Sequence, residues 1–185
     1  MKKTISTEWL SGCSGCHVAV VDLHEKLLSF CDEIEFVRIP VLADEKGYPK
    51  ADIGLIEGAI RSEHDREAAR KMRDSVSTLI AFGTCAVYGG PSGLGWLYNG
   101  DDVLEKTFGA GPTNVPGERP DSNAPALEKS VVPLDEVVKV DFYLPGCPPH
   151  PYWIAAAIVS LLHPEKEKVS QKTVCSRCER VMKKN

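Results

Sequence analysis

The 185-residue sequence lacks three features, and each absence excludes a class of protein. No apolar run approaches the roughly 18 residues that a membrane-spanning helix needs. Lys and Arg number 22 against 26 Asp and Glu, so the net charge is -4 at pH 7 and no broad basic field attracts nucleic-acid phosphates. The first residues have neither the apolar core nor the cleavage site of a secretory signal. We therefore expect a cytoplasmic protein that binds neither membranes nor nucleic acid.

Five segments have the apolar character of strands, and helical segments alternate with them. The expected strands cover residues 4–10, 34–39, 52–56, 78–82 and 137–144, and the expected helices cover 17–30, 63–76 and 154–162. Alternation of this kind is typical of an α/β protein with a doubly wound parallel sheet, and five strands suit the flavodoxin-like order 2-1-3-4-5.

Two segments do not fit the alternation of strands and helices. Residues 89–133 are rich in Gly and Pro and too long for a plain connector, so we expect a functional loop or an interface there. Residues 165–185 are charged and contain a Cys-x-x-Cys pair. The length suits one domain, so we expect a flavodoxin-like domain over 1–164 and a C-terminal tail over 165–185.

Cysteine is abundant, with 7 residues, and in a reducing compartment this favours metal or redox chemistry over disulfides. Cys13 and Cys16 follow the first expected strand, Cys85 follows the fourth, and Cys147 follows the fifth. Ligands of open parallel sheets bind at the carboxyl ends of the strands, and four thiolates there can hold a 4Fe-4S cluster. The positive end of the helix that follows Cys16 is expected to lower the pKa of the nearby thiols.

Other uses of these cysteines remain open at this point. A thioredoxin-like redox pair at Cys13 and Cys16 would leave Cys85 and Cys147 unexplained. Structural zinc usually takes two compact half-sites, whereas Cys85 and Cys147 stand alone. A flavin at this edge is suggested by fold analogy only. Cys31, within the first expected helix, is interpreted as a small buried hydrophobic residue.

Three motifs carry a resemblance to a known family. They are WLSGCSGC at residues 9–16, GTCA at 83–86 with Gly89-Gly90 after it, and LPGCPP at 144–149. In this order they resemble the small, electron-transfer subunit of NiFe hydrogenases. The resemblance implies that Cys13, Cys16, Cys85 and Cys147 hold one 4Fe-4S cluster, which takes electrons from the NiFe site of a separate large subunit.

Departures from the family pattern narrow the expected subtype. The 185 residues contain neither a twin-arginine motif, nor ligands for further clusters, nor an eight-cysteine ferredoxin-like segment, so we expect the short cytosolic form. The related subunit of respiratory complex I has adjacent cysteines where this chain has Cys13-Ser14-Gly15-Cys16. The sequence therefore most resembles the small subunit of the soluble NAD-reducing bidirectional hydrogenase.

The resemblance also implies a reaction and partners. The expected complex couples H2 oxidation to NAD+ reduction reversibly, and this subunit is not active alone. No Gly-x-Gly-x-x-Gly follows a strand, so the NAD site is expected in a diaphorase partner. The resemblance implies that FMN and further iron-sulfur clusters also lie in diaphorase subunits. One alternative is a sulfhydrogenase or another cytosolic hydrogenase with a different acceptor. An alternative of another class is a zinc-stabilised binding module.

Several further residues have two interpretations each. Glu57, in a Glu-Gly pair that resembles one near the family's cluster, is either a strand-end cap or a proton relay beside the large subunit. His150 either donates a hydrogen bond to a cluster sulfur or is an exposed interface residue. Tyr88, Trp96 and Tyr98 are expected to pack at an interface. Cys175 and Cys178 in the tail have several interpretations: a site for zinc or another metal, a reversible dithiol, or a pair without a role.

Overall fold

The protein is described from a computed structural model, which covers residues 2–120 and 122–163. Its centre is a sheet of five parallel strands in the spatial order β2-β1-β3-β5-β7. These strands are β1 (Lys3–Trp9), β2 (Ile34–Arg38), β3 (Ala51–Glu57), β5 (Val76–Phe82) and β7 (Phe142–Leu144). Counted along the chain, the order of these five is 2-1-3-4-5, so the predicted flavodoxin-like α/β fold is confirmed.

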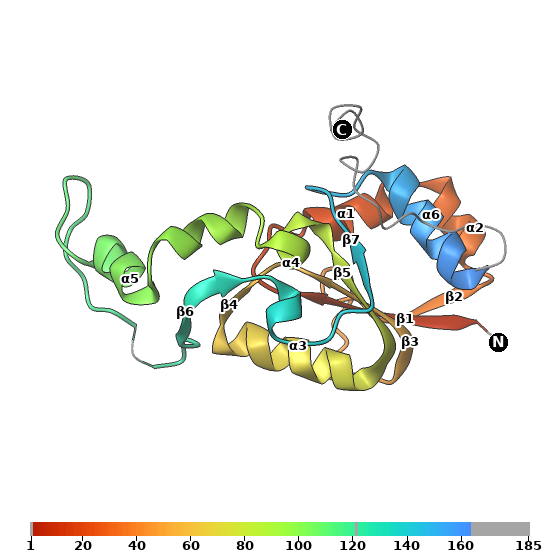
Figure 1. Ribbon diagram of the computed structural model, residues 1–185, viewed down its shortest axis with the longest axis horizontal. Coiled ribbons are helices and arrows are strands. Elements are labelled where there is room, and N and C mark those ends of the chain that lie inside the picture. The colour runs from red at the N-terminus through yellow and green to blue at the C-terminus, as the bar shows by residue number, and fades with distance from the viewer. Residues whose placement is uncertain (1, 121, 164–185) are drawn as a thin grey trace, which may run out of the picture.

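Helices cover both faces of the sheet (Figure 1). The helix α3 (Glu63–Ser75) lies on one face, and α1 (Gly15–Val21), α2 (Glu25–Phe30) and α6 (Pro151–Leu162) lie on the other. Alternate residues of the central strands point to opposite faces, so Leu79 packs with Met72 of α3 while Ile80 packs with Ile154 of α6. Because both faces of the central strands are buried, their sequences are continuous apolar runs.

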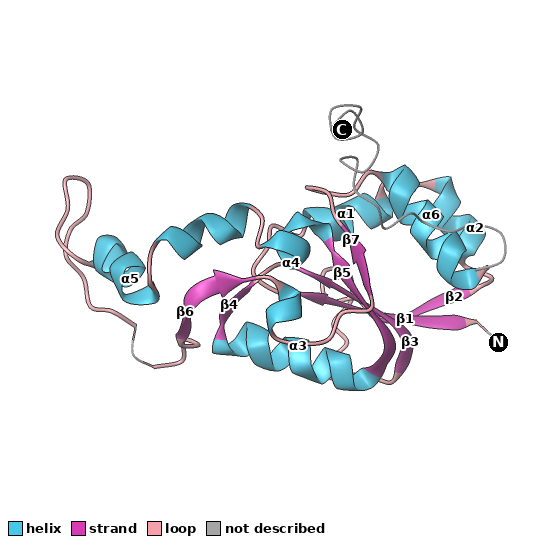
Figure 2. Cartoon of the chain, viewed as in Figure 1, coloured by secondary structure: helices cyan, strands magenta, loops and turns pink. Residues whose placement is uncertain are grey.

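The Gly/Pro-rich insertion, residues 89–133, contains regular structure. It includes the 3-10 helix η1 (Pro91–Leu97), α5 (Gly100–Phe108) and β6 (Leu127–Val132). β6 pairs antiparallel with the short strand β4 (Ile60–Ser62), and Glu128 of β6 forms an ion pair with Arg66 of α3. The insertion is therefore attached to the domain at β6, while α5 and the loop after it project away from the central sheet (Figure 2).

The helix predicted over residues 17–30 is two helices. α1 ends at Val21 and α2 begins at Glu25, because the chain turns sharply between them at His24, where φ is 51°. The prediction that Cys31 is buried is also wrong: the residue caps the exposed end of α2, a helix without buried residues.

The strand predicted over residues 137–144 is shortened to the three residues of β7. The 3-10 helix η2 (Leu134–Glu136) follows Pro133 and precedes the predicted strand. Asp141 then uses its carboxylate to accept hydrogen bonds from the Leu79 N–H (2.8 Å) and from Arg73 (2.6 Å), so regular pairing with β5 begins only after it.

Some sequence-based expectations fall outside the described residues. These include the tail over 165–185 with Cys175 and Cys178, and the side chain of Trp96. Within residues 2–120 and 122–163, no helix combines the length and the apolar character that crossing a bilayer requires.

Candidate iron-sulfur site

Four cysteines from three different strand ends line one cavity of about 60 Å³. Cys13 lies in the turn after β1, and Cys16 lies in the first turn of α1. Cys85 lies in the first turn of α4 (Gly83–Tyr88), which follows β5, and Cys147 lies in the loop after β7. Cys13 and Cys147 are exposed, whereas Cys16 and Cys85 are half-buried. The parallel sheet therefore brings together residues that are more than a hundred positions apart in the sequence.

Glycines keep the space beside three of the four sulfur atoms open. A Cβ atom on Gly83 would collide with the Sγ of Cys16, and one on Gly90 would lie 2.9 Å from the Sγ of Cys85. Both glycines have positive φ values, 86° and 55°, which residues with a side chain rarely adopt. A Cβ on Gly15 would lie 3.2 Å from the Sγ of Cys13. The room around the thiols thus depends on residues without side chains.

The donor set suits a cluster rather than a single ion. In the described part of the chain, no three His, Cys, Asp or Glu side chains converge closely enough to hold one metal ion. A 4Fe-4S cluster does not require such convergence, because its four thiolate ligands surround it and each binds a different iron. Four thiols spread around one cavity, with no competing nitrogen ligand among its lining residues, fit that requirement.

The surroundings raise, rather than lower, the pKa of the two half-buried thiols. Burial raises the pKa of Cys16 most, and the Glu57 carboxylate and the other three cysteines raise it further. Burial also raises the pKa of Cys85, although hydrogen bonds from the Ser92 N–H and hydroxyl oppose the rise. The expected lowering by the positive end of α1 is therefore wrong for Cys16. Bound iron would supply the positive charge that favours the thiolate form.

Glu57, at the end of β3, lines the same cavity and is only 2% exposed. Its Oε2 atom accepts a hydrogen bond from the His17 backbone N–H at 2.7 Å and lies 2.6 Å from the His17 Nδ1 atom. The carboxylate thus caps α1. The strand-end interpretation, in which it caps the segment that follows β3, is wrong. The other oxygen, Oε1, points toward Gly12, where an added Cβ would lie 3.5 Å from it.

His17 is a site residue that the sequence does not single out. Its ring is buried, and its Nε2 atom lies 2.8 Å from the Thr7 hydroxyl. The residue follows Cys16 directly, but its partner Glu57 is 40 positions away along the chain. No spacing rule connects a polar residue in the first turn of a helix with the end of a distant strand, so the pair becomes visible only in the fold.

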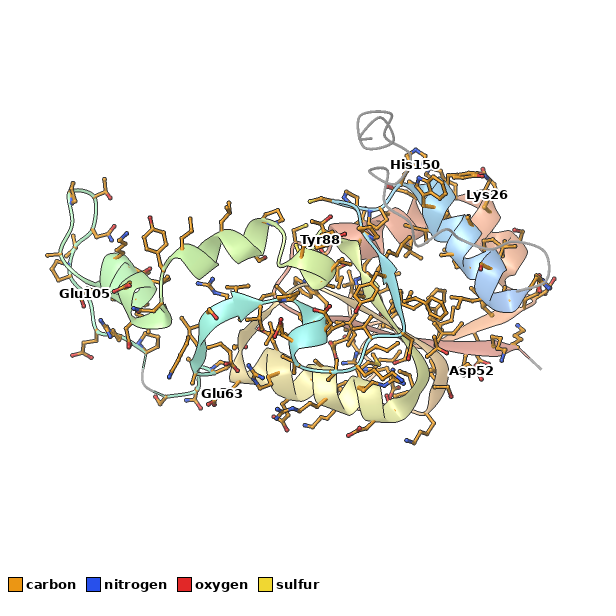
Figure 3. The ribbon with its side chains drawn as sticks, in the orientation of Figure 1. Lys26, Asp52, Glu63, Tyr88, Glu105 and His150 are labelled. Atoms are coloured by element: carbon orange, nitrogen blue, oxygen red, sulfur yellow. The ribbon has the colours of Figure 1, made fainter. Side chains whose placement is uncertain are left out.

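His150 lies outside the residues that line the cysteine cavity. It is the residue before α6 (Figure 3). Its Nδ1 atom accepts a hydrogen bond from the Tyr152 N–H at 3.1 Å. Tyr88 and Tyr98 are 65% and 47% exposed, and the Lys106 Nζ lies 3.9 Å from the ring centre of Tyr98. These residues lie at the surface. Their roles at an interface remain predictions.

The sequence from residue 13 to 161 matches the family described as the 20 kDa subunit of NADH ubiquinone oxidoreductase. The chain belongs to this family. One subunit of an F420-non-reducing hydrogenase from Methanocaldococcus jannaschii is 44% identical over 172 residues, which are 92% of this chain and 60% of the relative. The chain thus spans about 60% of the length of that relative.

Two further comparisons concern NAD-reducing hydrogenases. The HoxS delta subunit of the NAD-reducing hydrogenase from Cupriavidus necator is 34% identical over 155 residues, covering 80% of this chain and 73% of the relative. A crystal structure of an NAD+-reducing NiFe hydrogenase contains a chain with a TM-score of 0.85 and 34% identity, with coverage of 92% of this chain and 97% of that chain. The predicted resemblance to a hydrogenase small subunit is confirmed.

Proposed function

We propose that this chain is the electron-relay subunit of a cytosolic NiFe hydrogenase and that Cys13, Cys16, Cys85 and Cys147 hold one 4Fe-4S cluster. The observation that carries the proposal is the cavity at the carboxyl ends of β1, β5 and β7, which all four cysteines line. When bound, the cluster supplies one-electron transfer. The chain itself supplies the thiol ligands, the glycine-lined space and the buried Glu57 carboxylate beside Cys16.

The surface around the cavity supports a relay between partners. Large apolar side chains are exposed on elements that carry the four cysteines or adjoin them along the chain. Trp9, at the end of β1, donates its ring N–H to the carbonyl of Gly12, and Tyr88 lies on α4 with Cys85. Leu94 and Leu97 are exposed on η1, which follows α4 along the chain. Exposed aromatic and apolar residues of this size are typical of a surface that a partner covers. We propose that a large subunit with the NiFe site docks here, so that electrons cross the interface close to the exposed Cys13 side of the cavity.

The electron acceptor is the finer part of the proposal. A diaphorase module that holds FMN, NAD and its own iron-sulfur clusters is supported by the similarity to the HoxS delta subunit and to the NAD+-reducing enzyme. The 44% identity to the F420-non-reducing hydrogenase of M. jannaschii favours a second candidate, in which the same relay delivers electrons to a different acceptor. Both candidates assign the same role to the four cysteines.

Anaerobic purification of the complex through a tag on this chain would test the proposal. Mass spectrometry would identify the partner subunits, and H2-dependent reduction of NAD+ would be compared with that of a viologen dye. Reduction of both supports the diaphorase version, and reduction of the dye alone supports the second acceptor. Zinc without acid-labile sulfide in the purified chain would contradict the relay and favour a zinc-stabilised binding module.

A further inference from the structure

His17 connects two strands beneath the cysteine cavity. Its side chain is 1% exposed and lies between Thr7 of β1 and Glu57 of β3, with hydrogen-bond distances of 2.8 Å and 2.6 Å to them. A buried imidazole with a partner on both ring nitrogens has one fixed orientation. The ring is therefore a rigid link between the two strands and the first turn of α1.

The hydrogen-bond directions follow from the chemistry of the partners. An ionised carboxylate only accepts hydrogen bonds, so the Nδ1 atom of His17 carries the hydrogen and donates it to the Oε2 of Glu57. In this tautomer Nε2 accepts a hydrogen bond from the Thr7 hydroxyl. The Thr7 carbonyl in turn accepts a hydrogen bond from Arg38 at 2.6 Å. The ring thus contacts Thr7, within β1, on one side and Glu57, at the end of β3, on the other.

The two donors of residue 17 act on the same oxygen of Glu57. Oε2 accepts from both the backbone N–H and the ring, whereas Oε1 makes no hydrogen bond within residues 2–120 and 122–163. Oε1 is left on the side of Gly12, in the wall of the cysteine cavity. Holding Oε2 with two donors fixes the plane of the carboxylate and keeps Oε1 directed at that cavity.

We infer that His17 is a positioning residue that holds the Glu57 carboxylate beside the cysteine cavity and thereby lowers the reduction potential of the cluster bound there. This inference rests on the proposed function. Reduction adds a negative charge to the cluster, and a fixed carboxylate nearby makes that charge less favourable. Partners in the shell around a cluster set its potential through charge and hydrogen bonding.

Two substitutions of His17 separate positioning from mere space filling. In His17→Asn, the amide nitrogen of Asn is bonded to Cγ, as Nδ1 is in histidine. This variant therefore keeps a hydrogen-bond donor to Glu57 and loses the contact with Thr7. In His17→Gln, the amide extends toward the Nε2 position, so the contact with Thr7 is kept and the donor to Glu57 is lost. The two variants have similar polarity, and both retain the backbone hydrogen bond.

The measurement is the midpoint potential of the cluster in the purified complex, from a redox titration followed by electron paramagnetic resonance at one pH. Glu57→Gln is expected to shift the potential to more positive values, His17→Gln to shift it in the same direction by less, and His17→Asn to leave it near the wild-type value. His17→Gln is expected to add nothing to the shift of Glu57→Gln in the double variant, because it acts through that carboxylate.

Equal shifts in the Asn and Gln variants, no shift in His17→Gln, or additive shifts in the double variant would each overturn the inference. The first two outcomes would show that the ring does not act through its donor to Glu57, and the third would show that it acts independently of Glu57. A wild-type complex without a 4Fe-4S signal would instead refute the proposed function, so the two failures are distinguishable.

Discussion

The two ends of the parallel sheet differ in how their polar groups are satisfied. At the amino end, the first residues of β1, β3 and β5 line an open cavity of about 420 Å³. Asp52 there accepts hydrogen bonds from the Thr4 N–H at 2.9 Å and the Thr4 hydroxyl at 3.0 Å, and Lys50 donates to the Asp74 carbonyl at 2.6 Å. Figure 3 shows Asp52 on this side of the molecule.

At the carboxyl end, the cavity is much smaller, about 60 Å³, and its lining is different. Four thiols surround it, and glycines leave room beside the sulfur atoms. The polar groups of the amino end pair with one another, whereas the thiols of the carboxyl end face a space that the fold keeps open. The comparison teaches that the chemistry of the lining, rather than the size of the cavity, identifies the candidate site.

The largest expected effect comes from removing one thiol of the carboxyl end. Cys85→Ala should abolish the cluster, with a loss of about four iron atoms per chain, because a thiolate ligand is missing. Elemental analysis and electron paramagnetic resonance of the anaerobic complex measure this, and the same loss is expected for Cys13, Cys16 and Cys147. Cys31→Ala is the matched control and should keep the iron, since Cys31 is exposed at the end of α2. A full cluster signal in Cys85→Ala would exclude Cys85 as a ligand.

A smaller effect is expected from filling the glycine space. In Gly83→Ala the new Cβ would collide with the Sγ of Cys16, and the backbone has a φ of 86°. Such a residue costs roughly 1–2 kcal/mol in the left-handed region, and Cys16 must move. Iron content should therefore fall without disappearing.

Gly117→Ala is the control for this substitution, because nothing lies within 4 Å of the added Cβ. Equal iron content in the Gly83 and Gly117 variants would show that the space beside Cys16 is not needed.

At the amino end of the sheet, substitution of Asp52 should lower the free energy of unfolding and leave the cluster intact. Hydrogen bonds from the Thr4 N–H and hydroxyl lower the pKa of Asp52. Asp52→Asn should lower the free energy of unfolding by about 0.5–1 kcal/mol at pH 7, a small value because the side chain is 41% exposed. Urea unfolding and iron analysis measure the two effects. Loss of iron in this variant would remove the distinction between the ends of the sheet.

The pH dependence of this difference has a defined sign. Because the pKa of Asp52 is lower in the folded protein, its contribution is complete above its unfolded value of about 3.9 and is lost as the pH falls further. The difference between wild type and Asp52→Asn should therefore shrink below about pH 4. A difference that grows on acidification would contradict this assignment.

Substitution of the tail cysteines is also expected to leave the iron content unchanged. After four cysteines are assigned to the cavity, Cys31, Cys175 and Cys178 remain, too few thiols for a second four-cysteine cluster. The double variant Cys175→Ser with Cys178→Ser should keep its iron, although assembly with partners can weaken. Loss of about four iron atoms per chain would show that the tail ligates a cluster.

The strand order and the grouping of the four cysteines could be predicted from the sequence, because both depend on strong local signals. Central strands such as residues 78–82 are continuous apolar runs, and each cysteine motif follows directly after one strand. The parallel arrangement then places these motifs at one edge.

Other features depend on contacts between distant residues and have no such local signal. β6 is recognisable only through its pairing with β4 and the ion pair of Glu128 with Arg66. The break at His24 depends on a positive φ, and the exposure of Cys31 depends on its place at the end of the exposed helix α2; apolar spacing reveals neither. His17 cannot be found from the sequence because its partner is a residue on another strand.

The central claim is that the four cysteines hold the cluster through which electrons leave the H2-splitting site. The most direct test compares two activities of the purified complex that carries Cys85→Ala. Exchange between H2 and D2O requires only the NiFe site of the large subunit, whereas reduction of NAD+ or a dye by H2 requires the relay. The account predicts that isotope exchange persists while electron delivery falls to a few per cent or less. Delivery at the wild-type rate in this variant would contradict the account.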